Sequence, residues 1–394
     1  MSFERAYEGL RVVDLSQGIA GPYCAMLLAQ HGADVIKVEP PEGDWSRVLG
    51  KVQGDHAAFS IAGNLGKRSI AVDLKSELGR SIVDRLVAEA DIFIEGFRPG
   101  VIDRLGFSYD RLKERNPKLI YVSVSGFGQT GPLSKKPAMD PVLQAFSGAL
   151  DENRGQDGIP HRAPPVYFDM STAMYALQAV GAALYAIRDG HPGRRINLSL
   201  MESAANITTV RLQASVREGP YKPVAAPSGT YRTKNGWIQI AVVKDHEFQK
   251  VCQALGLLEF AVDPRFQKSV SRAQHADFLN GHVAELLLTR TSEEWRDILT
   301  EGDVQNELVQ TYTEFVNHPQ PKAIGLISWL PQPGWDELWP VPNPPGLPRL
   351  EPGQKQALSP SKGQHSREVL VEFGYTDEEI SGFIEAKTIL EPPG

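Results

Sequence analysis

The sequence predicts an α/β fold in which a doubly wound, mainly parallel sheet covered by helices is joined to a smaller α+β domain. Two observations predict the sheet. From residue 9 to about residue 125, short apolar runs alternate with amphipathic segments, as in chains whose strands and helices follow one another in turn. The spacing of the runs also suits right-handed crossovers. A third observation predicts the second domain, because Asn235-Gly236 separates two apolar runs and Asn-Gly is a strong hairpin signal.

Five apolar runs in the first part of the chain are interpreted as buried strands. They are Leu10–Leu15, Val35–Val38, Ser69–Leu74, Asp91–Glu95 and Leu119–Val124. Between them, Gly21–His31 and Glu77–Ala90 have the pattern of helices. Further along, Ser171–Ile187 is dominated by alanine and apolar residues, which predicts one long, closely packed helix.

The second domain is expected to begin near Pro227. Its hairpin strands are Gly229–Arg232 and Trp237–Val243, and helices are expected at about 246–255, 272–288 and 292–300. Prolines are dense between 331 and 360, which predicts an extended connector, and two helices, Ser366–Phe373 and Thr376–Ile384, follow it. The chain is therefore divided into residues 1–225, 226–330 and 331–394.

Composition and charge exclude several classes of function. The 394 residues carry a net charge of −7, whereas nucleic-acid binders need a surplus of Lys and Arg. Cys24 and Cys252 are the two cysteines, and neither belongs to a C-x-x-C pair, so no disulfide framework or metal site is expected. The polar start and the interrupted apolar stretch Met174–Ile187 predict neither a secretory signal nor a membrane span. We expect a cytoplasmic protein.

One glycine motif suggests a dinucleotide site that its context contradicts. Gly126–Gly131 matches G-x-G-x-x-G and follows a predicted strand. A phosphate-binding loop of that kind must open a helix, but Pro132 and Pro137 flank the charged residues that come next. We interpret the segment as a loop.

Ordered motifs along nearly the whole chain resemble those of the CaiB/BaiF, or class III, coenzyme A transferases. The matching residues are Gly9–Ser16, Ala20–Tyr23, Gly32–Pro40, Gly43-Asp44, Arg47, Asn64, Lys67–Ser69, Asp73–Lys75, Phe97–Gly100, Arg104–Gly106, Gly126–Pro132, Gln144-Ala145, Ser147-Gly148, Gly363–His365, Glu368–Leu370 and Gly374-Tyr375.

The resemblance implies both an architecture and an activity. In the family, N- and C-terminal segments together build a Rossmann-like large domain, so 331–394 would complete the domain begun by 1–225. Two ring-shaped subunits interlock as a homodimer. The activity is transfer of CoA from an acyl-CoA to a small carboxylic acid, through an aspartyl mixed anhydride and an aspartyl-CoA thioester. The CoA thioester is a substrate, and no permanently bound cofactor is expected.

Asp169, in the segment Tyr167–Thr172, matches the family's acylated aspartate. A carboxylate nucleophile suits the reaction because a mixed anhydride is reactive enough to take the thiol back. A helix N-terminus would stabilise its charge. Residue type alone favours another interpretation, in which Asp169 caps the helix by accepting the N–H groups of Ser171 or Thr172.

Family positions carried over one by one give the expected CoA site. Backbone at Ile19 and Ala20 should approach the ligand, Gly96, Phe97 and Arg98 should hold its phosphate region, and Lys136 is a substitute for a basic residue of some members. The nucleotide should be lined by Val72, Asp73, Leu74 and Lys75, with Arg104 and Leu105 on phosphate and adenine. Arg and Lys suit phosphate groups. Most basic side chains nevertheless belong to solvated helix faces.

Asp140 precedes Pro141 in a segment that the family places against the thioester end of CoA. Its carboxylate is expected either to position the substrate or to serve turn chemistry.

Two alternatives are weighed against the transferase. An α-methylacyl-CoA racemase needs a base on each face of the reacting carbon, and racemases of this family place a His where this chain has Met139. A non-catalytic CoA-binding protein would be favoured by loss of Asp169, which is present.

The identity of the substrate is open. The glycine run of oxalate-type members is replaced by Pro227–Thr230, and His161 and Arg162 could meet a second carboxylate. We hypothesise a dicarboxylic acceptor with succinyl-CoA as donor.

Overall fold

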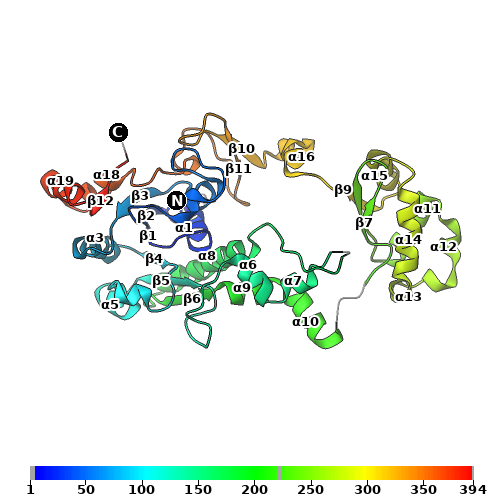
Figure 1. The fold of residues 1–394 in the computed structure, drawn as a ribbon, viewed down its shortest axis with the longest axis horizontal. Coiled ribbons are helices and arrows are strands. Elements are labelled where there is room, and N and C mark those ends of the chain that lie inside the picture. The colour runs from blue at the N-terminus through cyan, green and yellow to red at the C-terminus, as the bar shows by residue number, and fades with distance from the viewer. Residues whose placement is uncertain (1–4, 156, 220–223, 393–394) are drawn as a thin grey trace. The chain divides into compact units, whose positions relative to one another are not determined.

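The computed structural model describes residues 5–155, 157–219 and 224–392 (Figure 1). The chain divides into two compact units, Met1–Leu212 with Ile324–Gly394, and Gln213–Ala323. The first unit is discontinuous in sequence. Sequence analysis placed the corresponding boundaries at 225/226 and 330/331.

A seven-stranded sheet forms the centre of the first unit, in the order β12-β3-β2-β1-β4-β5-β6. All neighbours are parallel except β12 and β3. The strands are β1 (Arg11–Asp14), β2 (Asp34–Glu39), β3 (Arg68–Val72), β4 (Ile92–Glu95), β5 (Ile120–Ser125), β6 (Arg195–Ser199) and β12 (Ile389–Leu390). The predicted α/β class with a mainly parallel sheet is confirmed.

Helices cover both faces of this sheet. Those of the first unit are α1 (Ala20–Gln30), α2 (Ala58–Asn64), α3 (Glu77–Ala88), α4 (Val101–Arg104), α5 (Tyr109–Arg115), α6 (Asp140–Phe146), α7 (Ala149–Glu152), α8 (Tyr167–Arg188), α9 (Leu200–Ile207), α18 (Ser366–Glu372) and α19 (Asp377–Glu385), with the short 3-10 helices η2 (Trp45–Val48) and η4 (Lys355–Ala357). α10 (Thr209–Glu218) and α17 (Pro319–Ile324) lie where the chain passes from one unit to the other.

Strand residues alternate between two hydrophobic cores. Val12, Ile92 and Ile94 are buried with α1, α8 and α9, whereas Val13 and Phe93 are buried on the other face with α3, α18 and α19. Successive side chains of a strand point to opposite faces. A strand that is apolar at every position is therefore one that is covered on both sides.

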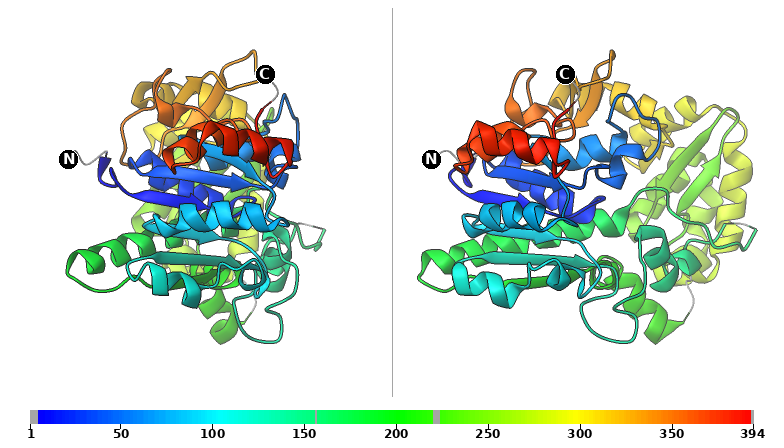
Figure 2. Two further views of the ribbon diagram at one scale, coloured as in Figure 1. Left: turned by 90° about the vertical axis from the view of Figure 1, so that its left-hand side faces the viewer. Right: turned by 60° about the vertical axis from the view of Figure 1, so that its left-hand side comes forward.

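The C-terminal segment joins the N-terminal strands (Figures 1 and 2). Ile389 of β12 pairs with Val72 of β3, and the Asp73 N–H donates to the Thr388 carbonyl at 2.8 Å. Val369, Leu370 and Ile380 of α18 and α19 are fully buried in the core over β3. The predicted C-terminal helices are present, and they cover one face of the sheet at β3.

Helix α8 begins four residues before the predicted start. By length and composition it is the one helix of the described residues that could cross a membrane. In the structure its small residues Ala173, Ala176 and Ala183 are buried against α1 and the sheet, as the alanine-rich pattern predicted.

Parts of the first unit were not predicted. β6 was missed because its residues are half-exposed or exposed except for Ser199, so it carries no apolar run. Within the proline-rich region, β11 (Trp339–Pro342) pairs antiparallel with β10 (Ile327–Leu330). Prolines fit this two-stranded sheet because both strands are edges.

The second unit has a three-stranded antiparallel sheet, in the order β7-β8-β9, packed on helices. Its elements are β7 (Gly229–Arg232), β8 (Trp237–Ala241), β9 (Gln305–Leu308), α11 (Asp245–Leu255), α12 (Leu258–Val262), η3 (Pro264–Phe266), α13 (Ser269–Gln274), α14 (Ala276–Leu287), α15 (Ser292–Glu301) and α16 (Tyr312–Asn317). The predicted hairpin is confirmed. The helix expected at 272–288 is divided at His275, and β9 was missed.

Candidate active site

The largest of four cavities found in the first unit lies where the strand order of the sheet reverses. β1 is flanked by β2 on one side and β4 on the other, and ligands of doubly wound sheets bind outside the carboxyl ends of strands at such a switch point. The cavity has a volume of about 600 Å³. It is lined by Leu15, Gln17, Ile19, Ala20, Gly21, Trp45, Gly96, Phe97, Arg98, Val124, Ser125, Gly126, Ala138, Met139, Asp169 and Leu200.

Two smaller cavities adjoin it and share its lining. One of about 130 Å³ shares Leu15, Gln17 and Phe97 with the largest cavity and extends to 72–75 at the end of β3. The other, of about 390 Å³, shares Gly96–Arg98 and extends to Lys136. Phe97 borders all three. Together the cavities form a branched groove suited to a long ligand with several distinct parts.

The Asp169 side chain borders the largest cavity. It is the third residue of α8 and is partly exposed. Its carboxyl group accepts no hydrogen bond from any described residue, and no side chain of α8 caps the start of the helix. Desolvation, followed by the charge of Asp140, raises the pKa of Asp169 to about 7. The capping interpretation is therefore wrong, and the oxygen atoms of the carboxyl group are left free to contact a ligand.

Asp140 performs the capping that Asp169 does not. It is buried, and its Oδ2 accepts the N–H groups of Phe168 at 2.7 Å and Asp169 at 3.2 Å. Gln144 Nε2 donates to Asp140 Oδ1 at 2.6 Å and to the Ala163 carbonyl at 3.1 Å. These contacts satisfy N–H groups that an uncapped helix leaves free and fix the backbone on which Asp169 stands.

Most of the predicted CoA-binding residues lie along the groove. Ile19 and Ala20 border the largest cavity with Asp169, at the start of α1. The residues that line the smallest cavity include Val72, Asp73, Leu74, Lys75 and Leu105, those at the junction include Gly96, Phe97 and Arg98, and Lys136 lines the third cavity. Arg104, the last residue of α4, is exposed and is not among the lining residues, and neither is buried Asp140. Their proposed contacts with CoA stay predictions.

The glycine motif at 126–131 is a loop, as predicted. Gly126 lines the groove at the end of β5, but no helix starts there.

Sequence reasoning missed several residues of the groove, among them Gln17 and Trp45. Gln17 follows β1 by three positions and borders two cavities, so the ends of neighbouring strands across the switch point could have indicated it. No signal in the sequence indicates Trp45, because contacts between distant segments bring it to the cavity.

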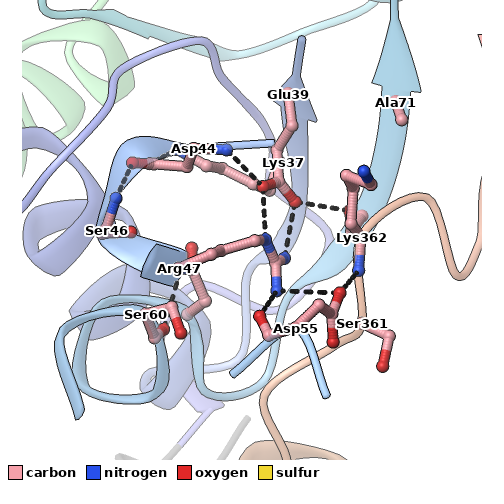
Figure 3. Close-up of polar contacts among 12 residues, drawn as sticks. Lys37, Glu39, Asp44, Ser46, Arg47, Asp55, Ser60, Ala71, Ser361 and Lys362 are labelled. Atoms are coloured by element: carbon pink, nitrogen blue, oxygen red, sulfur yellow. Dashed lines mark hydrogen bonds and ion pairs between the residues drawn. The ribbon is translucent and has the colours of Figure 1, made fainter. Parts of the chain in front are cut away.

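A buried charge network holds these segments (Figure 3). Arg47 forms two bonds of 2.6 Å with the carboxylate of Glu39, a bidentate pair, and donates to the Asp55 carbonyl at 3.1 Å. Burial alone would raise the pKa of Glu39, but the hydrogen bonds and charge of Arg47 outweigh it and hold the pKa below its usual range. Asp55 also accepts the backbone N–H of Lys362 at 2.5 Å, which ties the C-terminal segment to the network.

A second part of the network supports the turn after β1. Lys67 Nζ bonds Asp14 at 2.7 Å and Lys37 Nζ bonds Asp44 at 3.0 Å, and all four side chains are fully buried. Asp44 in turn accepts the Gly18 N–H at 3.1 Å. Paired and hydrogen-bonded in this way, the buried charges are stable in an apolar interior, and they fix the backbone between Gln17 and Ile19.

Glu95 supports the other side of the groove. It is buried at the end of β4, and its Oε2 accepts the Phe97 N–H at 2.9 Å. Burial raises its pKa to about 7. The side chain holds the turn that carries Phe97, the residue common to all three cavities.

Within residues 5–155, 157–219 and 224–392, no three His, Cys, Asp or Glu side chains gather as a metal site would require.

A doubly wound sheet with a branched groove at its switch point, and a carboxylate in the groove that no described residue pairs, is the arrangement of an α/β enzyme that binds an extended ligand. Comparison with known proteins agrees. The model of CoA-transferase family III matches residues 7–366.

Relatives of known function and solved structure match most of the chain. Acetyl-CoA:oxalate CoA-transferase of Acetobacter aceti is 34% identical over 82% of this chain and 85% of its own. Succinate–glutarate CoA-transferase of Agrobacterium fabrum is 33% identical over 93% and 95%. The crystal structure of a CAIB/BAIF family protein from Brucella suis matches with a TM-score of 0.82 and 30% identity, over 94% of this chain and 100% of that one.

The chain belongs to CoA-transferase family III, the CaiB/BaiF family. It is a CoA transferase that acts on an acyl-CoA and a carboxylate, and the resemblance seen in the sequence is confirmed.

Proposed function

We propose that the protein transfers CoA by a double displacement on the side chain of Asp169. A carboxylate oxygen of Asp169 attacks the thioester carbonyl carbon, the C–S bond breaks, and CoA leaves as a thiolate. The mixed anhydride is then attacked at the Asp169 carbonyl carbon by the thiolate, which releases the first carboxylate and leaves an aspartyl-CoA thioester. The acceptor carboxylate displaces the thiolate to form a second anhydride. The thiolate finally attacks the acceptor's carbonyl carbon and frees Asp169.

The observation that carries this mechanism is a partly exposed carboxyl group that borders the largest cavity and has no hydrogen-bond partner among the described residues. A carboxylate that donors already bind is a weak nucleophile, whereas Asp169 must offer its lone pairs to a carbonyl carbon. Its raised pKa of about 7 makes the anion more basic and still available near neutral pH. No step requires a permanently bound cofactor.

The groove supports a placement for CoA. The apolar side chains Val72, Leu74 and Leu105 with the ammonium group of Lys75 would enclose the nucleotide in the smallest cavity. Arg98 and Lys136 lie on the third cavity and would meet phosphate oxygens. The pantetheine arm would then pass Phe97 toward Asp169, which brings the thioester to the nucleophile.

Trapping of the acyl-enzyme tests the mechanism. The protein is incubated with a panel of acyl-CoAs, treated with hydroxylamine or borohydride, digested and analysed by mass spectrometry. Modification is expected on the peptide that contains Asp169, only when an acyl-CoA is present, and absent from the Asp169→Asn variant. Turnover of wild-type protein with no adduct on Asp169, or an adduct on another carboxylate, would refute the proposal.

The racemase alternative gains no support from the site. Met139, where racemases of the family carry a His, lines the cavity with its side chain half-exposed. The lining residues include one carboxylate and no His, so the second base of a proton transfer is missing from them.

We further propose a dicarboxylic acceptor, with succinyl-CoA as donor. Both curated relatives above carry dicarboxylates in their names, oxalate in one and succinate with glutarate in the other. Sequence analysis suggested His161 and Arg162 as partners of the second carboxylate. Both are exposed and absent from the lining of the cavity, where Arg98 is the one cation.

Variants of the two arginines test the acceptor site. If Arg162 meets the second carboxylate, Arg162→Ala raises the KM for a dicarboxylic acceptor and leaves that for the acyl-CoA unchanged. If the partner is Arg98, Arg98→Ala raises the KM for a dicarboxylic acceptor by a larger factor than the KM for the acyl-CoA, whose phosphates it would also meet, and Arg162→Ala is silent. If the enzyme instead acts on a monocarboxylate, each variant should change the KM for a monocarboxylate and the KM for a dicarboxylate by the same factor.

We propose that the protein works in the cytoplasm as an interlocked homodimer, as the family resemblance implies. Exposed apolar side chains on α8 and α10, among them Tyr185 at 67% and Val210 at 75%, are ones that a partner subunit would cover. Light scattering after gel filtration is expected to give twice the chain mass, unchanged on dilution.

A further inference from the structure

The part of the groove that receives the acyl group is identified by which residues the cavities share. The residues common to the largest cavity and its neighbours, such as Phe97, mark the path of CoA. Seven residues border only the largest cavity: Ile19, Ala20, Gly21, Trp45, Val124, Asp169 and Leu200. Because Asp169 is one of them, these residues surround the acyl group that it would carry.

Trp45 is the large accessible side chain in this set. Ile19, Ala20, Val124 and Leu200 are each less than 7% exposed, whereas 40% of Trp45 is exposed. An indole ring presents a wide apolar face with little freedom to move. It is therefore the surface that an acyl group on Asp169 would meet.

The ring of Trp45 packs against the backbone of Gly18. Gly18 has a φ of +83°, and a Cβ atom at residue 18 would lie 2.3 Å from Cζ2 of Trp45, so the ring rests directly on the Gly18 backbone. The residues on either side of Trp45 are anchored in the charge network of Figure 3. Asp44 bonds Lys37 at 3.0 Å and accepts the N–H groups of Gly18 and Ser46.

Arg47 is anchored as firmly on the other side, through its two bonds of 2.6 Å with Glu39. The residues on both sides of Trp45 are thus buried and paired, so the backbone that carries the ring is held in place.

We propose that Trp45 is the residue that sets the size of the acyl group, by forming a wall of the acyl subsite. The inference rests on the proposed function, because it requires the acyl group to be carried on Asp169. Short acyl chains fit beside the ring, and longer chains collide with it. The subsite selects by length at the end of the chain farthest from sulfur.

The test measures acylation of Asp169 directly and needs no acceptor. Wild-type protein, Trp45→Phe and Trp45→Ala are mixed with two series of donors, acetyl-, butyryl- and hexanoyl-CoA, and succinyl-, glutaryl- and adipyl-CoA. The rate of hydroxylamine-trapped Asp169 adduct is followed at several donor concentrations. Relative to the shortest donor of each series, the longest is expected to gain at least about tenfold in Trp45→Ala, since each methylene that a pocket accepts or rejects has an effect of this size. Trp45→Phe is expected to gain less, in the same direction.

Trp329→Ala is the matched control, because Trp329 of β10 is 47% exposed and is absent from the lining of the groove. It should leave the length profile unchanged. If Trp45→Ala forms the Asp169 adduct with the same dependence on donor length as the wild type, the role of Trp45 is overturned and the mechanism is left intact. Absence of an Asp169 adduct from wild-type protein with every donor instead refutes the proposed function. If Trp45→Ala does not fold, Trp45→Phe alone decides, since an unchanged ratio there is sufficient to reject the inference.

Discussion

Two regions of the large unit contain buried or half-buried carboxylates with opposite properties. In the charge network, Asp14 and Glu39 lie among Lys37, Lys67 and Arg47, whose charges outweigh the effect of burial and lower both carboxyl pKa values. At the cavity, Asp169 has no cationic partner in the part of the chain that the structure describes, and desolvation with the charge of Asp140 raises its pKa to about 7. The ionisable group is a carboxyl group in both regions, and the difference lies in its partners.

The comparison shows which property of a carboxylate distinguishes a structural role from a reactive one. A carboxylate whose lone pairs are all bound stabilises the fold and reacts with nothing, whereas one that is desolvated and unpaired is poised for reaction. The network holds the backbone at 17–19 and 45 around the cavity that Asp169 borders.

The largest effect is expected from removing the unpaired carboxylate. Asp169→Ala should lower kcat by at least about a thousandfold, because the nucleophile of a covalent mechanism is lost, while the protein stays folded. Steady-state transfer from succinyl-CoA measures it. Asp189→Ala, at the exposed far end of α8, is the control and should retain full activity. Comparable losses in both variants would show that the charge at 169 has no special role.

Breaking a pair in the network should show the opposite behaviour. Arg47→Met leaves Glu39 buried without its partner and is expected to lower the free energy of unfolding by about 3–5 kcal/mol, whereas Asp169→Asn should not destabilise. Urea unfolding followed by circular dichroism measures both. The double variant Arg47→Met with Glu39→Leu should recover most of the loss, because no uncompensated charge remains. Equal stability of Arg47→Met and wild type would remove the network from its structural role.

The pH dependence separates the two carboxylate environments further. Acylation requires the Asp169 anion, so the rate of adduct formation should rise with pH and level off above about 7. Asp140→Asn removes a like charge and should move this rise to lower pH, since Asp140 contributes to the raised pKa.

The contribution of Asp169 to the free energy of unfolding should fall as pH rises. The folded state binds the Asp169 proton more tightly than the unfolded chain does, so this contribution is present below the ordinary pKa of 3.8 and is lost as pH rises through about 7.

Single-turnover trapping between pH 5 and 9 measures the acylation rate, with Asp189→Asn as control. A rate independent of pH, or a midpoint that Asp140→Asn does not move, would contradict the assigned environment.

The smallest effect is expected at the exposed end of the groove. Lys75→Ala should raise the KM for acyl-CoA about two- to fivefold, the size of a solvent-exposed ion pair, and leave kcat unchanged. The difference should shrink at high ionic strength because salt screens it. Lys113→Ala is the control, since Lys113 of α5 is also exposed and lies away from the lining. An unaltered KM in Lys75→Ala would place the nucleotide elsewhere.

The sequence predicted the elements whose signals are local. Apolar runs located β1 to β5, and the Asn-Gly pair located the hairpin of β7 and β8. β6 was missed because its polar side chains face solvent, and β12 because two residues carry no periodic signal. The start of α8 was placed too late because its cap, Asp140, lies 28 positions earlier in the chain.

The same limit applied to the site. Motifs that resemble the family identified Asp169 and most of the residues along the groove, such as Ile19 and Phe97. Trp45 could not be predicted, since its place depends on a bond between Asp44 and the Gly18 N–H and on the pairing of Arg47 with Glu39. Periodicity does not report contacts between segments so far apart.

The pairing of β12 with β3 has a consequence for how the protein matures on the ribosome. β3 and residues 72–75 that follow it are synthesised early, but the Thr388 carbonyl that accepts the Asp73 N–H emerges only much later. Until then β3 is an open edge, and such edges invite mispairing with other chains. Throughout most of translation a nascent chain therefore lacks the strand that completes the sheet beside the cavity at 72–75. If that cavity holds the nucleotide, as proposed, the ability to bind the coenzyme arises only after β12 has been synthesised.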